Sequence, residues 1–204
     1  VVDVFWTSNT AGFSFVEYGI DGDLSQSTPV NNTALVDHDM ALLGLKAGET
    51  YNFRVVTTTE NGDELTSAIE TIELDPFPSE LPRIAISNYD ESNSQEGGYI
   101  LYSLVMAADT WTVIVDRDGD YVWYAQGEQD TLIPTSKVSL DGKSVLFTTN
   151  DSAQTDDISS ITRIAIDGSS ESVTEITTGH HDFAEVENGG YAFLGMDFQF
   201  HNVD

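Results

Sequence analysis

The sequence predicts an all-β protein in which a β-sandwich is followed by part of a β-propeller. The partial propeller is predicted from four hairpin-turn signals: Asp118-Gly119, Asp141-Gly142, Asp167-Gly168 and Asn188-Gly189. Corresponding signals recur 47 to 49 residues apart, and no stretch between them shows sustained helical periodicity. An interval of about 40–50 residues with four strands is typical of a propeller blade, so we expect about two and a half blades.

Residues 1–75 show the short alternating runs that are typical of β-sandwich strands. Apolar and polar side chains alternate over Val2–Trp6, over Phe13–Tyr18 and again over Tyr51–Val55. Turn-forming residues interrupt these runs at short intervals. The first 75 residues are therefore predicted to form one sandwich domain.

The stretch Leu45-Lys46-Ala47-Gly48-Glu49-Thr50-Tyr51 resembles the segment before strand F of fibronectin type III domains. The resemblance implies that Tyr51 is a tyrosine-corner residue, whose hydroxyl bonds to upstream backbone, and that Trp6 is the core tryptophan of strand B. It also implies that strand A is missing ahead of Val2. We expect a truncated beginning, or else an edge completed by another chain.

His38 lies between two acids, Asp37 and Asp39, ahead of the next expected strand. The sequence predicts a turn residue in a sandwich loop, with its pKa raised by these neighbours.

The proline-rich segment 76–83 cannot continue a sheet and predicts a domain boundary. Residues 84–204 are then predicted to be the propeller segment. The expected strands are 84–88, 99–105, 110–115 and 121–124 in blade one, 136–140, 144–149, 161–166 and 172–176 in blade two, and 182–187 and 191–196 in blade three.

Three histidines are candidate substrate-binding residues. His180 and His181 precede the first strand of blade three and His201 follows its second strand, so all three are expected on the face opposite the Asp-Gly turns, where ligands enter a propeller. Because neighbouring strand residues point to opposite sides, at most one of the pair should face the funnel. The alternatives are a structural role in pinning the crossover, or a metal site with Asp182.

The run Asp116-Arg117-Asp118-Gly119-Asp120 resembles the opening of a calcium loop. Its spacing departs from the EF-hand pattern, and it matches the hairpin turns of the other blades. A plain turn is the favoured interpretation; Asp116, Asp118 and Asp120 remain weak calcium ligands, and no other cofactor is expected.

The composition limits the partners. Asp and Glu number 35 against 7 Lys and Arg, for a formal net charge of −28, which repels nucleic acid and anionic membranes. The charge fits adaptation to salt or solubility, or divalent cation binding. Without cysteine the chain forms no disulfide, and no apolar run is long enough for a membrane span.

Two stretches together are similar to bacterial arylsulfotransferases. Thr112–Tyr124 has the family's strand, D-x-D-G turn and strand ending in Trp-Tyr; His180-His181-Asp182-Phe183 followed by Glu187–Tyr191 resembles its histidine-led strand before an N-G turn. A small sandwich ahead of the propeller is also shared with this family.

The resemblance implies a six-bladed exported enzyme, in the periplasm, at the cell surface or outside the cell. It would transfer a sulfuryl group between phenolic compounds through a sulfated histidine. His180 and His181 would bind sulfate, with the nucleophile in a later blade, so residues 1–204 alone should be inactive. The alternative is a non-catalytic extracellular module for binding, adhesion or assembly, with homo-oligomers or a surface assembly as partners.

Overall fold

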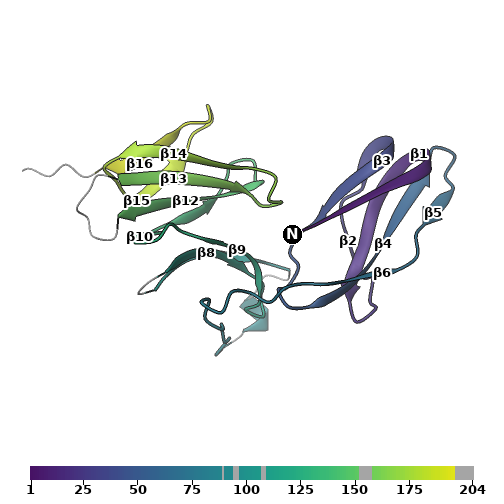
Figure 1. Ribbon diagram of the computed structural model, residues 1–204, viewed down its shortest axis with the longest axis horizontal. Coiled ribbons are helices and arrows are strands. Elements are labelled where there is room, and N and C mark those ends of the chain that lie inside the picture. The colour runs from purple at the N-terminus through teal and green to yellow at the C-terminus, as the bar shows by residue number, and fades with distance from the viewer. Residues whose placement is uncertain (89, 94–96, 107–108, 152–157, 196–204) are drawn as a thin grey trace, which may run out of the picture. The chain divides into compact units, whose positions relative to one another are not determined.

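The structure is a computed structural model of an all-β chain (Figure 1). It describes residues 1–88, 90–93, 97–106, 109–151 and 158–195. The chain divides into two compact units, Val1–Pro82 and Arg83–Asp204, and the division falls within the proline-rich segment 76–83. In the described part the helical content is a single 3₁₀ turn, Glu91–Asn93, so no described helix could cross a bilayer.

The first unit is built around one long strand that pairs with two different partners. The N-terminal half of β1 (Val2–Ile20) pairs antiparallel with β3 (Asn31–Leu42), and its C-terminal half pairs antiparallel with β4 (Thr50–Thr59). The register shifts between Thr7 and Gly12, where the strand changes partners. Only glycine fits at Gly12, because a Cβ there would lie 2.7 Å from the Thr58 carbonyl oxygen.

Short strands complete this unit. They are β2 (Gln26–Ser27) beside β1, and β5 (Glu64–Thr66) and β6 (Glu70–Glu73) beside β4. The core between the two ladders comes from both: Val4 and Leu42 from the β1–β3 pair, and Val16 and Tyr51 from the β1–β4 pair. The first unit is therefore a β-sandwich.

The tyrosine corner predicted from the sequence is confirmed. Tyr51 is only 2% exposed, and its hydroxyl oxygen accepts a hydrogen bond from the Lys46 backbone N–H at 2.9 Å. The bond satisfies the one polar atom of a large buried side chain. Trp6 packs against the same core but stays half-buried.

The prediction for His38 is wrong in both respects. His38 lies within β3, opposite Trp6, and its side chain is 4% exposed. Strand alternation turns the ring inward while Asp37 and Asp39 stay exposed. Burial lowers the pKa of the imidazole, and this effect exceeds the opposing effect of the Asp37 carboxylate.

The described residues from Arg83 onward form three antiparallel sheets in chain order. The first holds β7 (Ile100–Val105), β8 (Thr110–Val115) and β9 (Tyr121–Gln126). The second holds β10 (Thr131–Leu132), β11 (Ser136–Val138), β12 (Ser144–Asp151), β13 (Ile158–Ala165) and β14 (Glu171–Thr177). The third is the hairpin of β15 (Gly179–Glu185) and β16 (Tyr191–Gly195).

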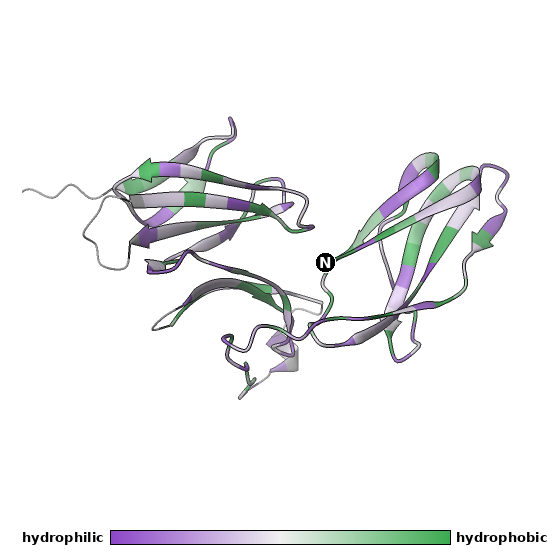
Figure 2. Cartoon of the chain, viewed as in Figure 1, coloured by the Kyte–Doolittle hydropathy of each residue, from purple (hydrophilic) through white to green (hydrophobic). Residues whose placement is uncertain are grey.

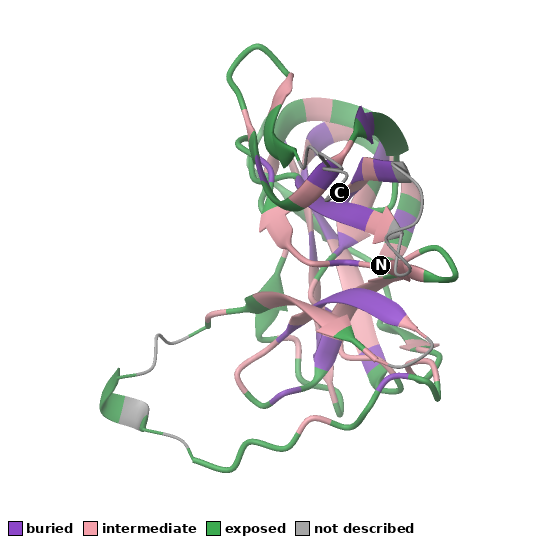
Figure 3. Cartoon of the chain, turned by 90° about the vertical axis from the view of Figure 1, so that its left-hand side faces the viewer, coloured by how far each residue is buried: buried purple, intermediate pink, exposed green. Residues whose placement is uncertain are grey.

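Successive sheets stack against each other through apolar side chains. Val145 and Phe147 on one face of β12 pack with Leu101, Ile114 and Trp123 of the first sheet. Leu146, on the opposite face, packs with Ile161, Phe183 and Tyr191, the last two from the third sheet. Apolar and polar residues alternate along these strands, and the buried residues gather on them (Figures 2 and 3). This face-to-face stacking of small sheets is the arrangement of propeller blades.

The four predicted hairpin turns are confirmed. In each, the glycine N–H donates to the carbonyl three residues earlier, and the glycine has a positive φ between 71° and 88°. The glycines are Gly119, Gly142, Gly168 and Gly189. That conformation is unfavourable for residues with a Cβ, which explains the glycine in every turn.

One expected strand is not formed. Residues 84–88 begin with the apolar run Ile84–Ile86 but have no ladder partner in the described structure. Conversely, β10 was not predicted, because a two-residue strand is too short to show a period.

Candidate functional site

The histidine pair lies in an irregular part of β15. Phe183 pairs with Phe193 and Gly179 pairs with Gly195, so β15 has two more residues than β16 over this stretch. The irregularity coincides with positive φ angles at Thr178 (54°) and His181 (62°). The strand therefore contains a bulge at the two histidines.

The bulge brings both imidazole rings together. The ring centroids of His180 and His181 are 3.7 Å apart, and the ring planes meet at 79°. The expectation that adjacent residues point to opposite sides holds only for a regular strand, and here it is wrong because His181 adopts a left-handed conformation. His180 is half-buried and His181 is exposed, so the pair is reachable from solvent.

The backbone ahead of the pair is held by the second sheet. The Asn150 side-chain amide on β12 donates to the Gly179 carbonyl at 2.7 Å. The Gly179 N–H donates to Ser159 Oγ at 2.8 Å, and that hydroxyl donates in turn to the Ile176 carbonyl. These bonds fix the chain at the point where β15 begins.

An ion pair holds the chain after the histidines. Lys137 Nζ on β11 lies 2.7 Å from Asp182 Oδ1, and the same ammonium donates to the Phe183 carbonyl oxygen. The hydrogen bond from Lys137 is the main reason that the pKa of Asp182 lies below its usual value. Lys137 thus ties the second sheet to the segment that carries the histidines.

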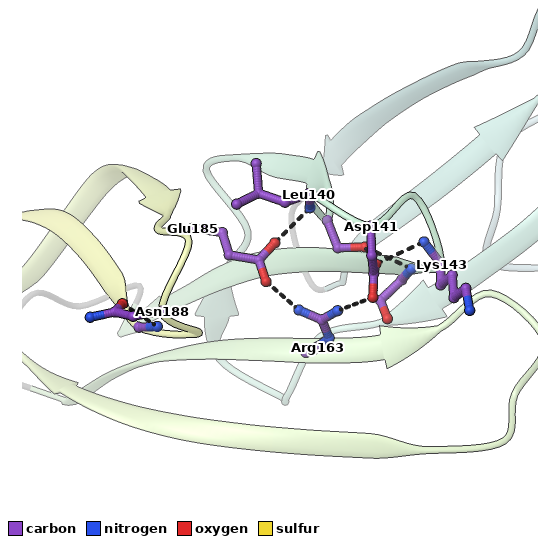
Figure 4. Close-up of polar contacts among 9 residues, drawn as sticks. Leu140, Asp141, Lys143, Arg163, Glu185 and Asn188 are labelled. Carbon is purple, nitrogen blue, oxygen red and sulfur yellow. Dashed lines mark hydrogen bonds and ion pairs between the residues drawn. The ribbon is translucent and has the colours of Figure 1, made fainter.

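A second charged cluster joins the same sheets farther along β15 (Figure 4). The Arg163 guanidinium on β13 donates to Glu185 Oε1 at 2.6 Å and to Asp141 Oδ2 at 3.1 Å. Glu185 Oε2 accepts a further bond from the Leu140 N–H at 2.7 Å. Glu185 also holds the pKa of Arg163 above its usual value. We call Lys137, Asp182, Arg163, Glu185 and Asp141 the inter-sheet cluster.

The inter-sheet cluster was not predicted, although the sequence contains a signal for part of it. Lys137 and Asp182 are 45 residues apart, and Leu140 and Glu185 are also 45 apart. Both separations lie near the blade interval, so these residues occupy equivalent places in neighbouring sheets. A search for opposite charges one blade interval apart would have found the Lys137–Asp182 pair.

The aspartates of the first Asp-Gly turn do come together. Carboxylate oxygens of Asp116, Asp118 and Asp120 all lie within 4.8 Å of one another. Asp116 Oδ1 accepts from the N–H groups of Asp118 and Asp120, so one of its oxygens already serves the turn. The geometry favours a turn, with carboxylates that a calcium ion could share.

The metal-site alternative at the histidines gains no support. Among the described residues, the group of three potential ligands within ligating distance is that of the aspartates, and His180, His181 and Asp182 do not form one. The remaining candidate, His201, lies outside the described residues.

Comparisons of the chain with protein-family models, with curated proteins and with solved structures gave no match.

Proposed function

We propose that this chain belongs to an exported arylsulfotransferase-like enzyme that transfers a sulfuryl group between phenolic compounds. The observation that carries the proposal is the bulge that places the His180 and His181 rings 3.7 Å apart and within reach of solvent. A sulfate ester presents several oxygens around one sulfur. Two adjacent imidazoles can each donate an N–H to such a group.

The proposed role of the pair is to bind the anionic sulfate group. A chain with a net charge of −28 repels anions in general, so a sulfate ester needs local donors. Imidazole can supply an N–H in its neutral form and two in its charged form. The resemblance assigns the nucleophilic histidine to a later blade, and the pair would stabilise the transferring group there.

The first test is transfer from 4-nitrophenyl sulfate to phenol by the protein isolated from its source. The variants His180→Asn and His181→Asn keep a polar side chain but alter the donors. Each should lower kcat/KM on the order of 10²-fold, the usual effect of losing one transition-state hydrogen bond. Glu187→Gln, at an exposed position of the same hairpin, is the matched control and should leave transfer unchanged.

Phenol-dependent release of nitrophenol that both histidine variants retain in full would contradict the role of the pair. No transfer by the correctly folded source protein would contradict the enzyme itself. Loss of transfer in the histidine variants but not in Glu187→Gln is the result we expect.

The second candidate is a non-catalytic extracellular module for binding or assembly. The ion pairs of Lys137 and Arg163 favour it, because both cations are used to hold two sheets together. In an enzyme acting on anions, such cations would be useful at the substrate. Absence of transfer, together with self-association of the source protein, would select this candidate.

A further inference from the structure

We infer that His38 is an acid-sensitive contact of the sandwich: protonation of its buried imidazole destabilises the folded first unit, because it adds a charge and an N–H without an acceptor beside the segment where β1 changes partners. This inference concerns the first unit and is independent of the proposed function.

Side chains of the neighbouring strand β1 surround the His38 ring. It stacks on the Trp6 indole, with centroids 4.8 Å apart and planes inclined by 16°. Its Nε2 lies 3.2 Å from Ser8 Oγ and 3.5 Å from Ser14 Oγ. Ser14 in turn is hydrogen-bonded to Thr57 of β4 at 2.8 Å, so the ring belongs to a polar network inside the sandwich.

The network defines which nitrogen carries the proton. The Ser8 hydroxyl donates to the Thr10 carbonyl at 2.7 Å and therefore accepts from the imidazole. Nε2 then carries a proton, and in the neutral form of the ring Nδ1 has a lone pair. In the described structure Nδ1 is buried and has no hydrogen-bond partner.

Acid must place a second proton on Nδ1. The new N–H would have no acceptor among the described residues, and the ring would carry a charge at 4% exposure. Both changes penalise the native state, while a solvated histidine in the unfolded chain takes up the proton without this penalty.

Two neighbours oppose this effect. Asp37 lies next to His38 on β3, is exposed, and accepts a hydrogen bond from Thr7 Oγ1 at 2.8 Å. The Trp6 face attracts a cation. Asp39 is exposed on the other side, and the side chains facing the ring from β1 and β4, which are Ser8, Ser14 and Thr57, carry no charge. Burial nevertheless dominates, and the pKa of His38 is lowered.

The sign of the pH dependence follows. The unfolded chain binds the proton below about pH 6.5, whereas the native state binds it only at a lower pH. Between these two values the unfolding constant rises as the pH falls, by up to about tenfold per pH unit for one proton. Stability is fully present above pH 6.5 and is lost on acidification.

The network lies where β1 changes partners. Ser8 lies within the register shift between Thr7 and Gly12, and Ser14 ends the next shift, between Gly12 and Ser14. Both serines contact the same imidazole nitrogen. Mild acid should therefore loosen this part of the sandwich.

The test is an NMR pH titration of the whole chain. The His38 imidazole signals should titrate with a midpoint below about 6.5, the ordinary value for a histidine. A His38 midpoint at or above 6.5 would overturn the inference. This measurement needs no variant.

A second measurement uses His38→Phe, which keeps an aromatic ring on Trp6 but cannot titrate. Unfolding constants from pH 7.5 to 5.5 come from methyl signals of Val16 and Val56, both in the sandwich. The rise of the unfolding constant on acidification should disappear in His38→Phe. It should persist in the control variant His180→Asn/His181→Asn. An unchanged pH dependence in His38→Phe would overturn the inference.

Discussion

The two units of this chain use polar and charged side chains in different ways. The sandwich encloses a buried histidine, His38. The ion pair described there, Arg54–Glu17, joins directly paired residues of neighbouring strands at the surface. In the stacked sheets, Lys137 and Arg163 connect strands of different sheets. A single apolar core suffices to hold two ladders together, whereas stacked blades also use charges that bridge from sheet to sheet.

The apolar cores differ correspondingly. In the sandwich, one cluster draws residues from both ladders, including Val4, Val16 and Leu42. In the stacked sheets, two smaller clusters lie on opposite faces of β12, one around Val145 and the other around Leu146. The second sheet therefore depends on a neighbour on each side, while the sandwich supplies both sides of its own core.

The largest expected effects come from emptying each core in turn. Leu42 and Ile161 are both 0% exposed, and replacing either by alanine should cost about 2–5 kcal/mol through lost burial and the cavity that remains. Hydrogen exchange measured by mass spectrometry shows which part of the chain loses stability in each variant. Leu42→Ala should raise exchange in residues 2–59, and Ile161→Ala in residues 144–195.

The control is Leu140→Ala, at a position that is 66% exposed, where stability should change by less than about 0.5 kcal/mol. Equal acceleration throughout the chain in both core variants would contradict separate cores.

A smaller effect should separate the two kinds of ion pair. Arg163 and Glu185 side chains are 26% and 14% exposed, against 37% and 25% for Arg54 and Glu17. Arg163→Met leaves Glu185 without its cation and should cost about 1–2 kcal/mol. Arg54→Met, the matched control, should cost only about 0.2–1 kcal/mol, because solvent already screens that pair.

Denaturant unfolding at low and high salt checks this contrast, since salt weakens exposed pairs more than half-buried ones. Equal losses in both variants would mean that the inter-sheet cluster is no more than a surface contact.

Much of the fold could be predicted from local patterns. The Asp-Gly and Asn-Gly turns fixed the hairpins because the positive φ of their glycines is a local requirement. The tyrosine corner of Tyr51 followed from a short spacing as well. The strand expected at 84–88 is not formed because a short apolar run alone does not supply a pairing partner, and strand pairing is a long-range property.

The candidate site could be predicted only in part. The blade interval places His180 and His181 ahead of the first strand of blade three, whereas the structure has both within β15. No pattern in the sequence indicates the left-handed conformation of His181 that accompanies the contact of the two rings. His38 was misjudged because its sequence neighbours are acidic, whereas its neighbours in space are Trp6, Ser8 and Ser14. Side-chain direction in a strand depends on register, which local sequence leaves open.

The most direct test of the central claim is an NMR titration of this chain with 4-nitrophenyl sulfate, following the imidazole signals of its histidines. If the bulge forms an anion-binding pair, the His180 and His181 signals should shift together and saturate, while the buried His38 signal stays in place. Phenol, which is uncharged near neutral pH, should produce no such shift. Unchanged His180 and His181 signals, or equal shifts with phenol, would contradict sulfate binding by the pair.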